Sequence, residues 1–409
     1  MLAIPAALLV SILLARTLGP NDYGTYTFAL SLINLFALVL TGGISQLVTR
    51  EVAFALHEHD RGLIKGVILS STAWGLMSSI LAIFGIWGAL ALFGSGMDRT
   101  TRVLLLTGSA ALPILALAPV WAGTLRGHGL GAKSQFPGLL LMPLTQLVTV
   151  TVLISLDMLV VRTAMIAFVL SNTVVALVGL YLMKKTVSDT LRNAVATYRL
   201  SRWSKSSAIF TGIALITYLN TQIGVLLLGL TSTKADVAAF QIADRAAQFV
   251  ILTIAIIELV LAPHVARHHK ARQHERLQGL FSVSRRIGAA ITFVVALPMI
   301  FYGATIIRLL FGEIYVETVV QPLAIISIAL VVRALFGPTS TFLSMTGNER
   351  STLAALGLAL LVNVILTLIL APKMGATGAG WASAAGIVTW SLLLGHQTQH
   401  KLDIPILRI

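Results

Sequence analysis

The sequence predicts an all-helical membrane protein, and two observations carry that prediction. Hydrophobic residues make up 57% of the 409 residues, the mean hydropathy is +0.91, and only 11% of residues are charged, against roughly 25% in soluble domains. The hydrophobic residues are gathered in long runs separated by Gly, Pro or charged residues. Only helices and closed barrels satisfy backbone hydrogen bonds in lipid, and these runs are too long and too uniformly hydrophobic for barrel strands. We therefore expect a helical bundle.

Twelve of these runs are predicted to be transmembrane helices, although the first is shorter than the roughly 20 residues that cross a bilayer. They are placed at 1–15, 24–45, 65–93, 103–125, 137–156, 161–183, 207–230, 237–262, 287–311, 319–344, 351–371 and 378–396. The chain is hydrophobic from Met1 and has no basic segment at its start, so we expect no cleaved signal peptide.

Loop charges predict the orientation in the membrane. When both termini are placed in the cytoplasm, the loops and tail on that side contain most of the 29 basic residues, as the positive-inside rule requires. The formal net charge of +14 is therefore interpreted as membrane topology rather than as nucleic-acid binding. We predict a multi-pass protein of the cell inner membrane with both termini cytoplasmic.

The two halves of the chain repeat each other. Three pairs of similar segments stand in register, namely 22–26 with 236–240, 92–94 with 310–312, and 125–129 with 343–347. They predict a duplicated six-helix unit, whose copies are related by an axis along the membrane normal. The predicted division is an N-terminal lobe at 1–184, a basic cytoplasmic linker at 185–206, a C-terminal lobe at 207–396 and a cytoplasmic tail at 397–409.

Two segments combine basic residues with hydrophobic ones. The linker from Lys184 to Lys205 is expected to lie on the anionic cytoplasmic membrane surface; a plain solvated loop is the alternative. In the segment 263–286, His264 and His268 have a spacing that metal ligands use on a helix. Neighbouring cations would repel a metal ion, so no metal site is expected there.

Ionisable residues inside a membrane are costly, which makes each of them a candidate functional residue. The predicted eighth span has most of them: Gln241, Asp244, Arg245 and Gln248 follow i, i+3, i+4, i+7 spacing and share one helix face. Glu258 lies only about 40° from Asp244 on the helical wheel. This face is expected to border the bundle interior or a wet cavity, and a buried ion pair with a neighbouring helix is the alternative.

Other spans contain single polar residues, namely Asn34, Asn220, Gln222 and Asn363. Such residues more often form interhelical hydrogen bonds than ligand contacts. Arg333 differs from them because it has no carboxylate near it in its own span. It is expected either to pair with Asp244 or Glu258 or to present its charge to an anionic substrate.

Enzyme motifs are missing from the sequence. It contains no cysteine, which excludes disulfides, thiolate metal sites and cysteine nucleophiles. It also has no P-loop, no Gly-x-Ser-x-Gly motif and no Asp-x-Asp nucleotide-sugar motif. We therefore expect neither enzymatic activity nor ATP hydrolysis, and no cofactor.

Several segments resemble one family. The segment 14–26, Leu-Ala-Arg-Thr-Leu-Gly-Pro-Asn-Asp-Tyr-Gly-Thr-Tyr, is similar to the signature near the start of polysaccharide exporters, the lipid-linked oligosaccharide flippases related to MATE transporters in the MOP superfamily. Later segments that look like the family are Thr49-Arg50-Glu51, Val237 to Arg245, Leu310 to Tyr315, Thr346-Gly347-Asn348, Asn363 and Gly375 to Ala379. Ala238 and Phe240 replace the usual Gly and Tyr of the family, so only the general shape of that motif is kept.

The resemblance implies a MATE/MOP-like fold of two pseudo-symmetric six-helix lobes around a central cavity. It also implies a flippase that carries an undecaprenyl-diphosphate-linked oligosaccharide to the outer leaflet by alternating access, for the O-antigen of lipopolysaccharide, capsule or exopolysaccharide. The expected partners are this cargo, membrane lipids and other polysaccharide-assembly membrane proteins, with no nucleic acid.

The residue roles that follow are expectations of the same kind. The diphosphate needs cations, for which Arg245 and Arg333 are the interior candidates and Arg50 the candidate at the cytoplasmic mouth. The candidate sugar contacts are Gln241, Gln248, Asn34, Asn220 and Asn363. Asp244 and Glu258 would take up H⁺ or Na⁺ if an ion gradient drives the cycle.

Other functions remain open at this point. The principal alternative is a MATE-type cation-coupled exporter of drugs or metabolites, which would need carboxylates in the lumen, whereas the first six predicted spans have none near their middle. A membrane glycosyltransferase or glycan ligase would need catalytic residues in large outer loops, whereas the predicted outer loops are short. A scaffold without transport would not need the polar face of the eighth span.

Overall fold

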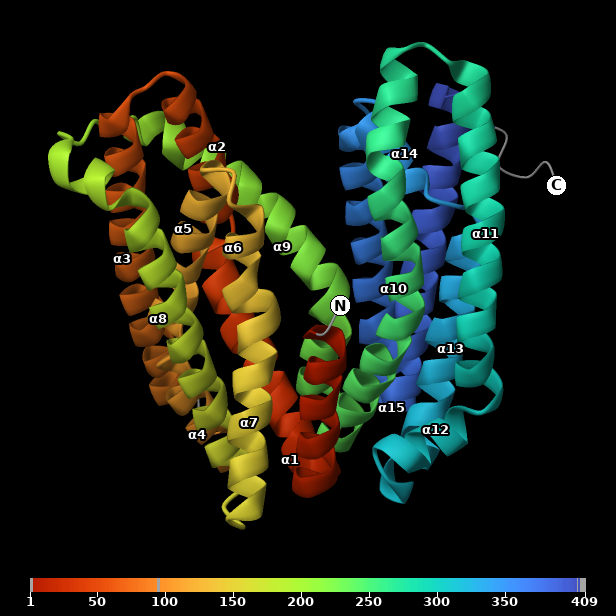
Figure 1. Ribbon diagram of the computed structural model, residues 1–409. Coiled ribbons are helices and arrows are strands. Elements are labelled where there is room, and N and C mark those ends of the chain that lie inside the picture. The colour runs from red at the N-terminus through yellow and green to blue at the C-terminus, as the bar shows by residue number, and fades with distance from the viewer. Residues whose placement is uncertain (1–2, 94–95, 403, 405–409) are drawn as a thin grey trace. The chain divides into compact units, whose positions relative to one another are not determined.

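The computed structural model describes residues 3–93, 96–402 and 404. Helices joined by short turns make up the fold, and the described part of the chain contains no β-strand (Figure 1). In that part, nine helices are long and hydrophobic enough to cross a membrane, or ten when the bent pair Arg99–Ser109 and Leu112–Gly127 counts as one span. The prediction of a multi-pass, all-helical membrane protein is confirmed.

Two of these helices contain a break at a glycine. Helix α1 (Ala3–Thr41) is non-helical at Gly19, where φ is 76° and ψ is 173°, and α15 (Glu349–Leu402) is non-helical at Gly375, where φ is 55° and ψ is −134°. An unbroken helix with the 54 residues of α15 would be about 80 Å long, far more than a bilayer core of roughly 30 Å. Each break therefore separates two helical segments. The described residues thus contain a helix in each of the twelve predicted regions, although only nine or ten helices meet the length and hydropathy expected of a membrane span.

The chain forms two compact units, Met1–Tyr218 and Leu219–Ile409. Besides α1, the N-terminal unit contains α2 (Ile44–His57), α3 (Arg61–Phe93), α4 (Arg99–Ser109), α5 (Leu112–Gly127), α6 (Gly131–Gln135), the π-helical turn η2 (Phe136–Leu141), α7 (Met142–Ser155), α8 (Val161–Asn193) and the first part of α9 (Leu200–Thr231). Helix α5 packs against α2, α3 and α8, and α7 packs against α1 and α8.

Helix α2 extends the second predicted span beyond its expected end at residue 45. Its buried residues are Ile44, Leu47, Val48, Glu51, Val52 and Ala55, a helical period that polar neighbours hide from a hydropathy window. Helix α2 packs closely on α5, with no room for a side chain at Gly127 of α5: an added Cβ there would lie 2.6 Å from Cβ of Val52. Small residues at such crossings let helices approach closely.

The C-terminal unit contains the rest of α9, α10 (Lys234–Lys270), α11 (His274–Phe301), α12 (Gly303–Leu310), the 3₁₀ turn η3 (Glu313–Tyr315), α13 (Val316–Leu335), α14 (Thr339–Met345) and α15. Helix α13 packs against α10, α11 and α15. At one end of the unit, the rings of Phe281 and Phe342 meet edge to face with centroids 5.0 Å apart. Of the predicted tail at 397–409, residues 403 and 405–409 lie outside the described residues.

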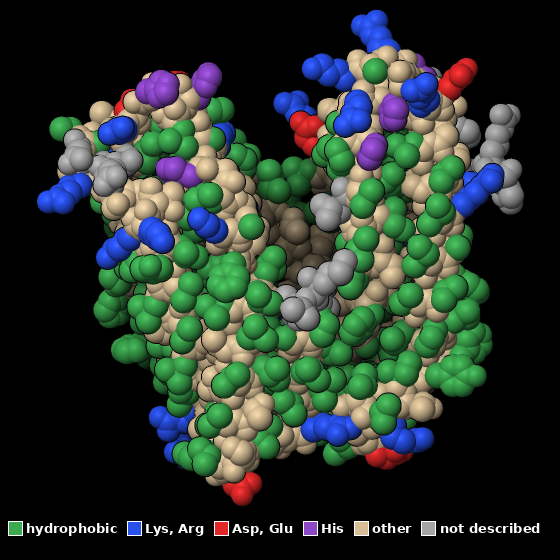
Figure 2. Space-filling model, viewed as in Figure 1, with side chains coloured by type: hydrophobic (Ala, Val, Ile, Leu, Met, Phe, Trp, Pro, Cys, Tyr) green, Lys and Arg blue, Asp and Glu red, His purple; other side chains and the backbone are tan. Residues whose placement is uncertain are grey.

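The surface pattern agrees with a lipid environment. Hydrophobic side chains lie along the lengths of the helices, and Lys, Arg and His gather at the helix ends (Figure 2). On α3, Trp74, Leu81 and Phe84 are each more than half exposed. Exposing such a hydrophobic surface to water is unfavourable, whereas the hydrocarbon chains of lipids can cover it.

Candidate functional site

Helix α10 carries the polar face that the sequence predicts. Thr233 and Asp236 form a capping box at its start, in which each side chain bonds the other residue's backbone N–H, so the helix begins at a fixed point. Further along, Gln248 Nε2 donates to Asp244 Oδ2 at 3.3 Å, and Arg245 Nη1 donates to Gln248 Oε1 at 3.4 Å. Three of the four predicted residues are thus joined in one hydrogen-bonded chain.

The guanidinium of Arg245 is incompletely satisfied. Its Nε is buried and has no acceptor among the described residues, and it makes no ion pair with a described carboxylate. Gln241, one helical turn earlier, is only 5% exposed. A buried N–H without a partner costs about 1–3 kcal/mol, and either water or a bound ligand can supply the acceptor.

Arg333 has two partners in the same unit. Its Nη2 lies 3.8 Å from Glu258 Oε1, and its guanidinium carbon lies 4.5 Å from the centre of the Trp390 ring. The sequence left open whether Arg333 pairs with a carboxylate, and the structure identifies Glu258 as the partner. At 3.8 Å this is an ion pair without a hydrogen bond, so both groups keep hydrogen-bonding capacity.

A small cavity of about 20 Å³ adjoins Glu258, enough for about one water molecule. Its lining comes from α10, α11, the end of α13 and the turn between α13 and α14. It consists of Ile254, Ile257, Glu258, Ser284, Gly288, Ala334, Gly337 and Pro338. The predicted tenth span is interrupted here, because α13 ends at Leu335 and α14 begins at Thr339. Gly337 has a φ of +75°, which glycine adopts without strain.

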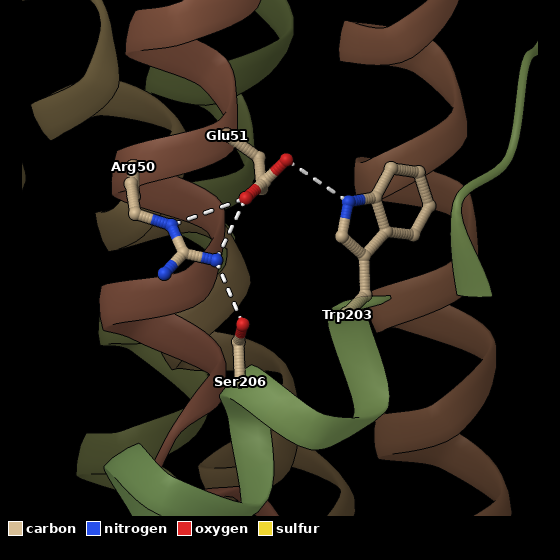
Figure 3. Close-up of polar contacts among 4 residues, drawn as sticks. All are labelled: Arg50, Glu51, Trp203 and Ser206. Carbon is tan, nitrogen blue, oxygen red and sulfur yellow. Dashed lines mark hydrogen bonds and ion pairs between the residues drawn. The ribbon is translucent and has the colours of Figure 1, made fainter. Parts of the chain in front are cut away.

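Arg50 belongs to a polar cluster in the N-terminal unit (Figure 3). Its Nε and Nη2 donate to Glu51 Oε1 at 3.1 and 2.8 Å, and Nη2 also donates to Ser206 Oγ at 2.9 Å. Trp203 Nε1 donates to Glu51 Oε2 at 3.0 Å. The Arg50 guanidinium lies 5.4 Å from the centre of the Phe210 ring.

This cluster attaches the start of α9 to α2. The two backbones are close, since a Cβ on Gly43 would lie 2.1 Å from Ser207 O, and Gly43 N donates to Thr211 Oγ1 at 2.9 Å. Glu51 is 6% exposed and neutralises much of the Arg50 charge. Sequence reasoning missed Glu51, Trp203 and Ser206; the helical period of buried residues in α2 is the signal that points to Glu51.

The remaining predicted residues are dispersed. Asn34 is half-buried on α1. Asn220 Nδ2 donates to Leu356 O at 3.2 Å, which joins α9 to α15, and Asn363 accepts from Thr367 Oγ1 at 3.0 Å within α15. The Asn220 bond is the interhelical kind that is usual for amides in membrane proteins, whereas the Asn363 bond lies within one helix.

No metal cluster accompanies these residues. Among the described residues, no group of three or more His, Asp or Glu is placed to hold a metal ion. Of the histidines in the basic segment 263–286, His268 bonds Gln273 Oε1 through Nδ1 at 2.8 Å.

Known proteins with similar sequences or structures identify a family and a fold for this chain. The family described as "Polysaccharide biosynthesis protein" matches residues 13–321. No curated protein matches the chain.

Solved structures match almost the whole chain. An inward-facing multidrug resistance MATE family transporter of the MOP superfamily matches with a TM-score of 0.80 at 16% identity, covering 98% of this chain and 94% of that one. Lipid II flippase MurJ, in an inward closed conformation, matches with a TM-score of 0.74 at 16% identity over 97% and 86% of the two chains. A MOP superfamily transporter from Pyrococcus furiosus, whose binding pocket is described as having reverse polarity, gives 0.65 at 16% identity over 98% and 94%. The chain therefore has the MATE/MOP fold.

Proposed function

Because the chain belongs to the polysaccharide biosynthesis protein family and has the MATE/MOP fold, we propose that it is a transporter that moves a lipid-linked oligosaccharide across the inner membrane. The cargo class is an oligosaccharide on an isoprenoid diphosphate, delivered from the cytoplasmic to the outer leaflet by alternating access. No chemical step is required of the protein, and an H⁺ or Na⁺ gradient is the proposed driving force.

The observation that carries this proposal is that the hydrogen-bonding capacity of the Arg245 guanidinium is only partly used. Its buried Nε has no acceptor among the described residues. A diphosphate supplies several strong acceptor oxygens, and guanidinium groups bind such oxygens in pairs. In a hydrophobic span, an anionic cargo explains why a costly arginine is present there.

Arg333 is the second proposed contact for the anion. Its 3.8 Å separation from Glu258 leaves its N–H groups able to turn towards another acceptor, while stacking on Trp390 holds the guanidinium in place. We assign Gln241, Gln248 and Asn34 to the sugar hydroxyls. Asp244 and Glu258 are the proposed ion-coupling groups.

The orientation is part of the same proposal. Basic residues are concentrated in the segments 184–205 and 263–286, so the positive-inside rule favours both of these in the cytoplasm, together with both termini. Helix α10 then runs from the outer side at Lys234 towards the cytoplasm at Lys270.

A MATE-type exporter of cationic drugs is the second candidate, favoured by the TM-score of 0.80 with such a transporter. A cationic substrate needs uncompensated carboxylates. Glu51 is buried but already bonded to Arg50 and Trp203, and Glu258 is paired with Arg333. Asp244 forms no ion pair with a described cation and accepts only from the neutral Gln248, so it is the one carboxylate of the site that would suit such a substrate. Resistance to cationic drugs in a pump-deficient strain, with no change in surface glycan, would favour this second function.

The direct test replaces the arginines in a strain whose own copy is deleted. We expect Arg245→Ala and Arg333→Ala to abolish surface glycan and to accumulate lipid-linked oligosaccharide inside the cell, with normal membrane insertion. Arg267→Ala is the matched control, because Arg267 is exposed near the end of α10, the helix that carries Arg245. Wild-type surface glycan from both variants would overturn the assignment.

A further inference from the structure

The segment between α8 and α9, residues 194–199, is fixed against α3 rather than loosely attached. Thr197 N donates to Gly62 O at 3.1 Å, and Lys65 Nζ donates to Ala194 O at 2.9 Å. A Cβ on Gly66 would lie only 1.8 Å from Thr197 O, so the backbone of the segment lies directly on the helix. These contacts make it a rigid platform at one end of the N-terminal unit (Figure 1).

An open hollow of about 720 Å³ lies on this platform and continues onto the first turns of α9. Its lining residues are Tyr198, Arg199, Leu200, Ser201, Arg202, Lys205 and Ser206. Three of them are cations and none is acidic. Arg199, Arg202 and Lys205 are all exposed, and none forms an ion pair with a described carboxylate. The hollow is therefore open and positively charged, which suits an anion.

Hydrophobic side chains are exposed beside these cations. Val195 is 86% exposed, Leu200 59% and Tyr198 54%. Trp203, in contrast, is 3% exposed and bonded to Glu51, so the segment does bury a large side chain where it packs on the protein. Cations mixed with exposed aliphatic and aromatic residues are typical of surfaces that lie at the boundary between lipid headgroups and acyl chains.

The position along the chain agrees with such a boundary. The hollow lies after the end of α8 and at the first turns of α9. Both of these helices are candidate membrane spans. A free phosphate ion would need the cations alone, whereas a phospholipid also covers the hydrophobic side chains. We propose that this hollow binds the headgroup of an anionic phospholipid, with Arg199, Arg202 and Lys205 around its phosphate and with Val195, Tyr198 and Leu200 at the level of the upper acyl chains.

The hollow belongs to the N-terminal unit and the proposed cargo contacts Arg245 and Arg333 to the C-terminal unit, and the proposal does not depend on what the protein transports. A lipid bound there adds to the contacts that hold the start of α9 on α2 and α3. Its occupancy would therefore stabilise the N-terminal unit.

The test uses the full-length protein in an uncharged detergent and native mass spectrometry. Phosphatidylglycerol and phosphatidylcholine with the same acyl chains are added in equal amounts. We expect the wild type to retain phosphatidylglycerol preferentially. We also expect the triple variant R199Q/R202Q/K205Q to reduce that preference at least about tenfold, because each basic residue near an anionic lipid surface contributes on the order of fivefold.

The matched control is R267Q/K270Q/R276Q, which removes the same charge from three exposed positions of the C-terminal unit. It should retain the wild-type preference, and both triple variants should elute as the wild type does in gel filtration. An unchanged preference in R199Q/R202Q/K205Q would overturn the proposal, as would an equal loss in the control. Displacement of phosphatidylglycerol by an equal concentration of inorganic phosphate would also overturn it, since the hollow would then be a site for free anions.

Discussion

Asp236 Oδ1 accepts a hydrogen bond of 3.1 Å from the backbone N–H of Ala376. Ala376 begins the second half of α15, directly after the non-helical Gly375. The same carboxylate accepts from Thr233 Oγ1 at 2.7 Å within the capping box of α10. One acidic side chain therefore caps the starts of two helices that lie far apart in sequence, and it stabilises both because helix N-termini favour negative charge.

Gly375→Ala should destabilise the protein. The residue has a φ of +55°, and an added Cβ would lie 2.2 Å from Asp236 Oδ1, so both the backbone and the cap would have to move. We expect a loss of about 1–3 kcal/mol, measured by thermal unfolding in detergent. Gly357→Ala on the same helix meets nothing within 4 Å and should be neutral or slightly stabilising; equal stability of the two variants would contradict the argument.

Glu51→Gln should also destabilise the protein. The amide has one oxygen acceptor and no charge, so Arg50 and Trp203 can no longer both donate to it as they do to Glu51. The expected cost is about 1–3 kcal/mol for an unsatisfied buried group. Glu58→Gln, at an exposed position at the end of α2, is the control; if it lowers the unfolding temperature as much, the buried cluster is not the cause.

Gly66→Ala should release the segment 194–199 from α3, because the new Cβ would overlap Thr197 O at 1.8 Å. A local destabilisation of about 1.4 kcal/mol raises the open population about tenfold. Limited tryptic digestion, with peptides identified by mass spectrometry, should therefore show about tenfold faster cleavage after Arg199. Gly85→Ala on the same helix meets nothing within 4 Å and should be cleaved there at the wild-type rate.

Glu258→Gln tests the proposed ion coupling. The amide keeps the size of the side chain but cannot bind a proton and cannot neutralise Arg333, which lies 3.8 Å away. In proteoliposomes we expect transport of lipid-linked oligosaccharide to lose its response to a pH or Na⁺ gradient. Glu275→Gln, at an exposed position of α11, should respond as the wild type does. A gradient response that survives Glu258→Gln would exclude this carboxylate as the coupling group.

Much of the fold is predictable from local sequence signals. Gly19-Pro20 stops a hydrophobic run, and the structure has a helix break at Gly19. The spacing of Gln241, Asp244, Arg245 and Gln248 predicts one helix face, and hydrogen bonds join three of these residues along α10. Such features depend on periodicity and on Gly and Pro conformations, both of which are local properties.

Contacts between distant helices are harder to predict. Arg333 could be matched to either of two carboxylates, and only the packing of α13 against α10 selects Glu258. Glu51 appears exposed in a hydropathy window because it stands beside Arg50, and its burial depends on Trp203, 152 residues later. A hydropathy window likewise does not detect α2, because polar residues alternate with the hydrophobic residues of its buried face.

The length of α10 has a consequence for how a charged cargo would pass through. Arg245 and Glu258, the partner of Arg333, are thirteen residues apart on this one helix, which places them about 20 Å apart along its axis. A diphosphate is much shorter than that backbone separation, so the two arginines offer it positions at different depths along the helix axis. In the proposed orientation Arg333 lies nearer the cytoplasm and Arg245 nearer the outer side. The headgroup would then bind first to Arg333 and afterwards to Arg245, and each arginine would have to bind it weakly enough for release.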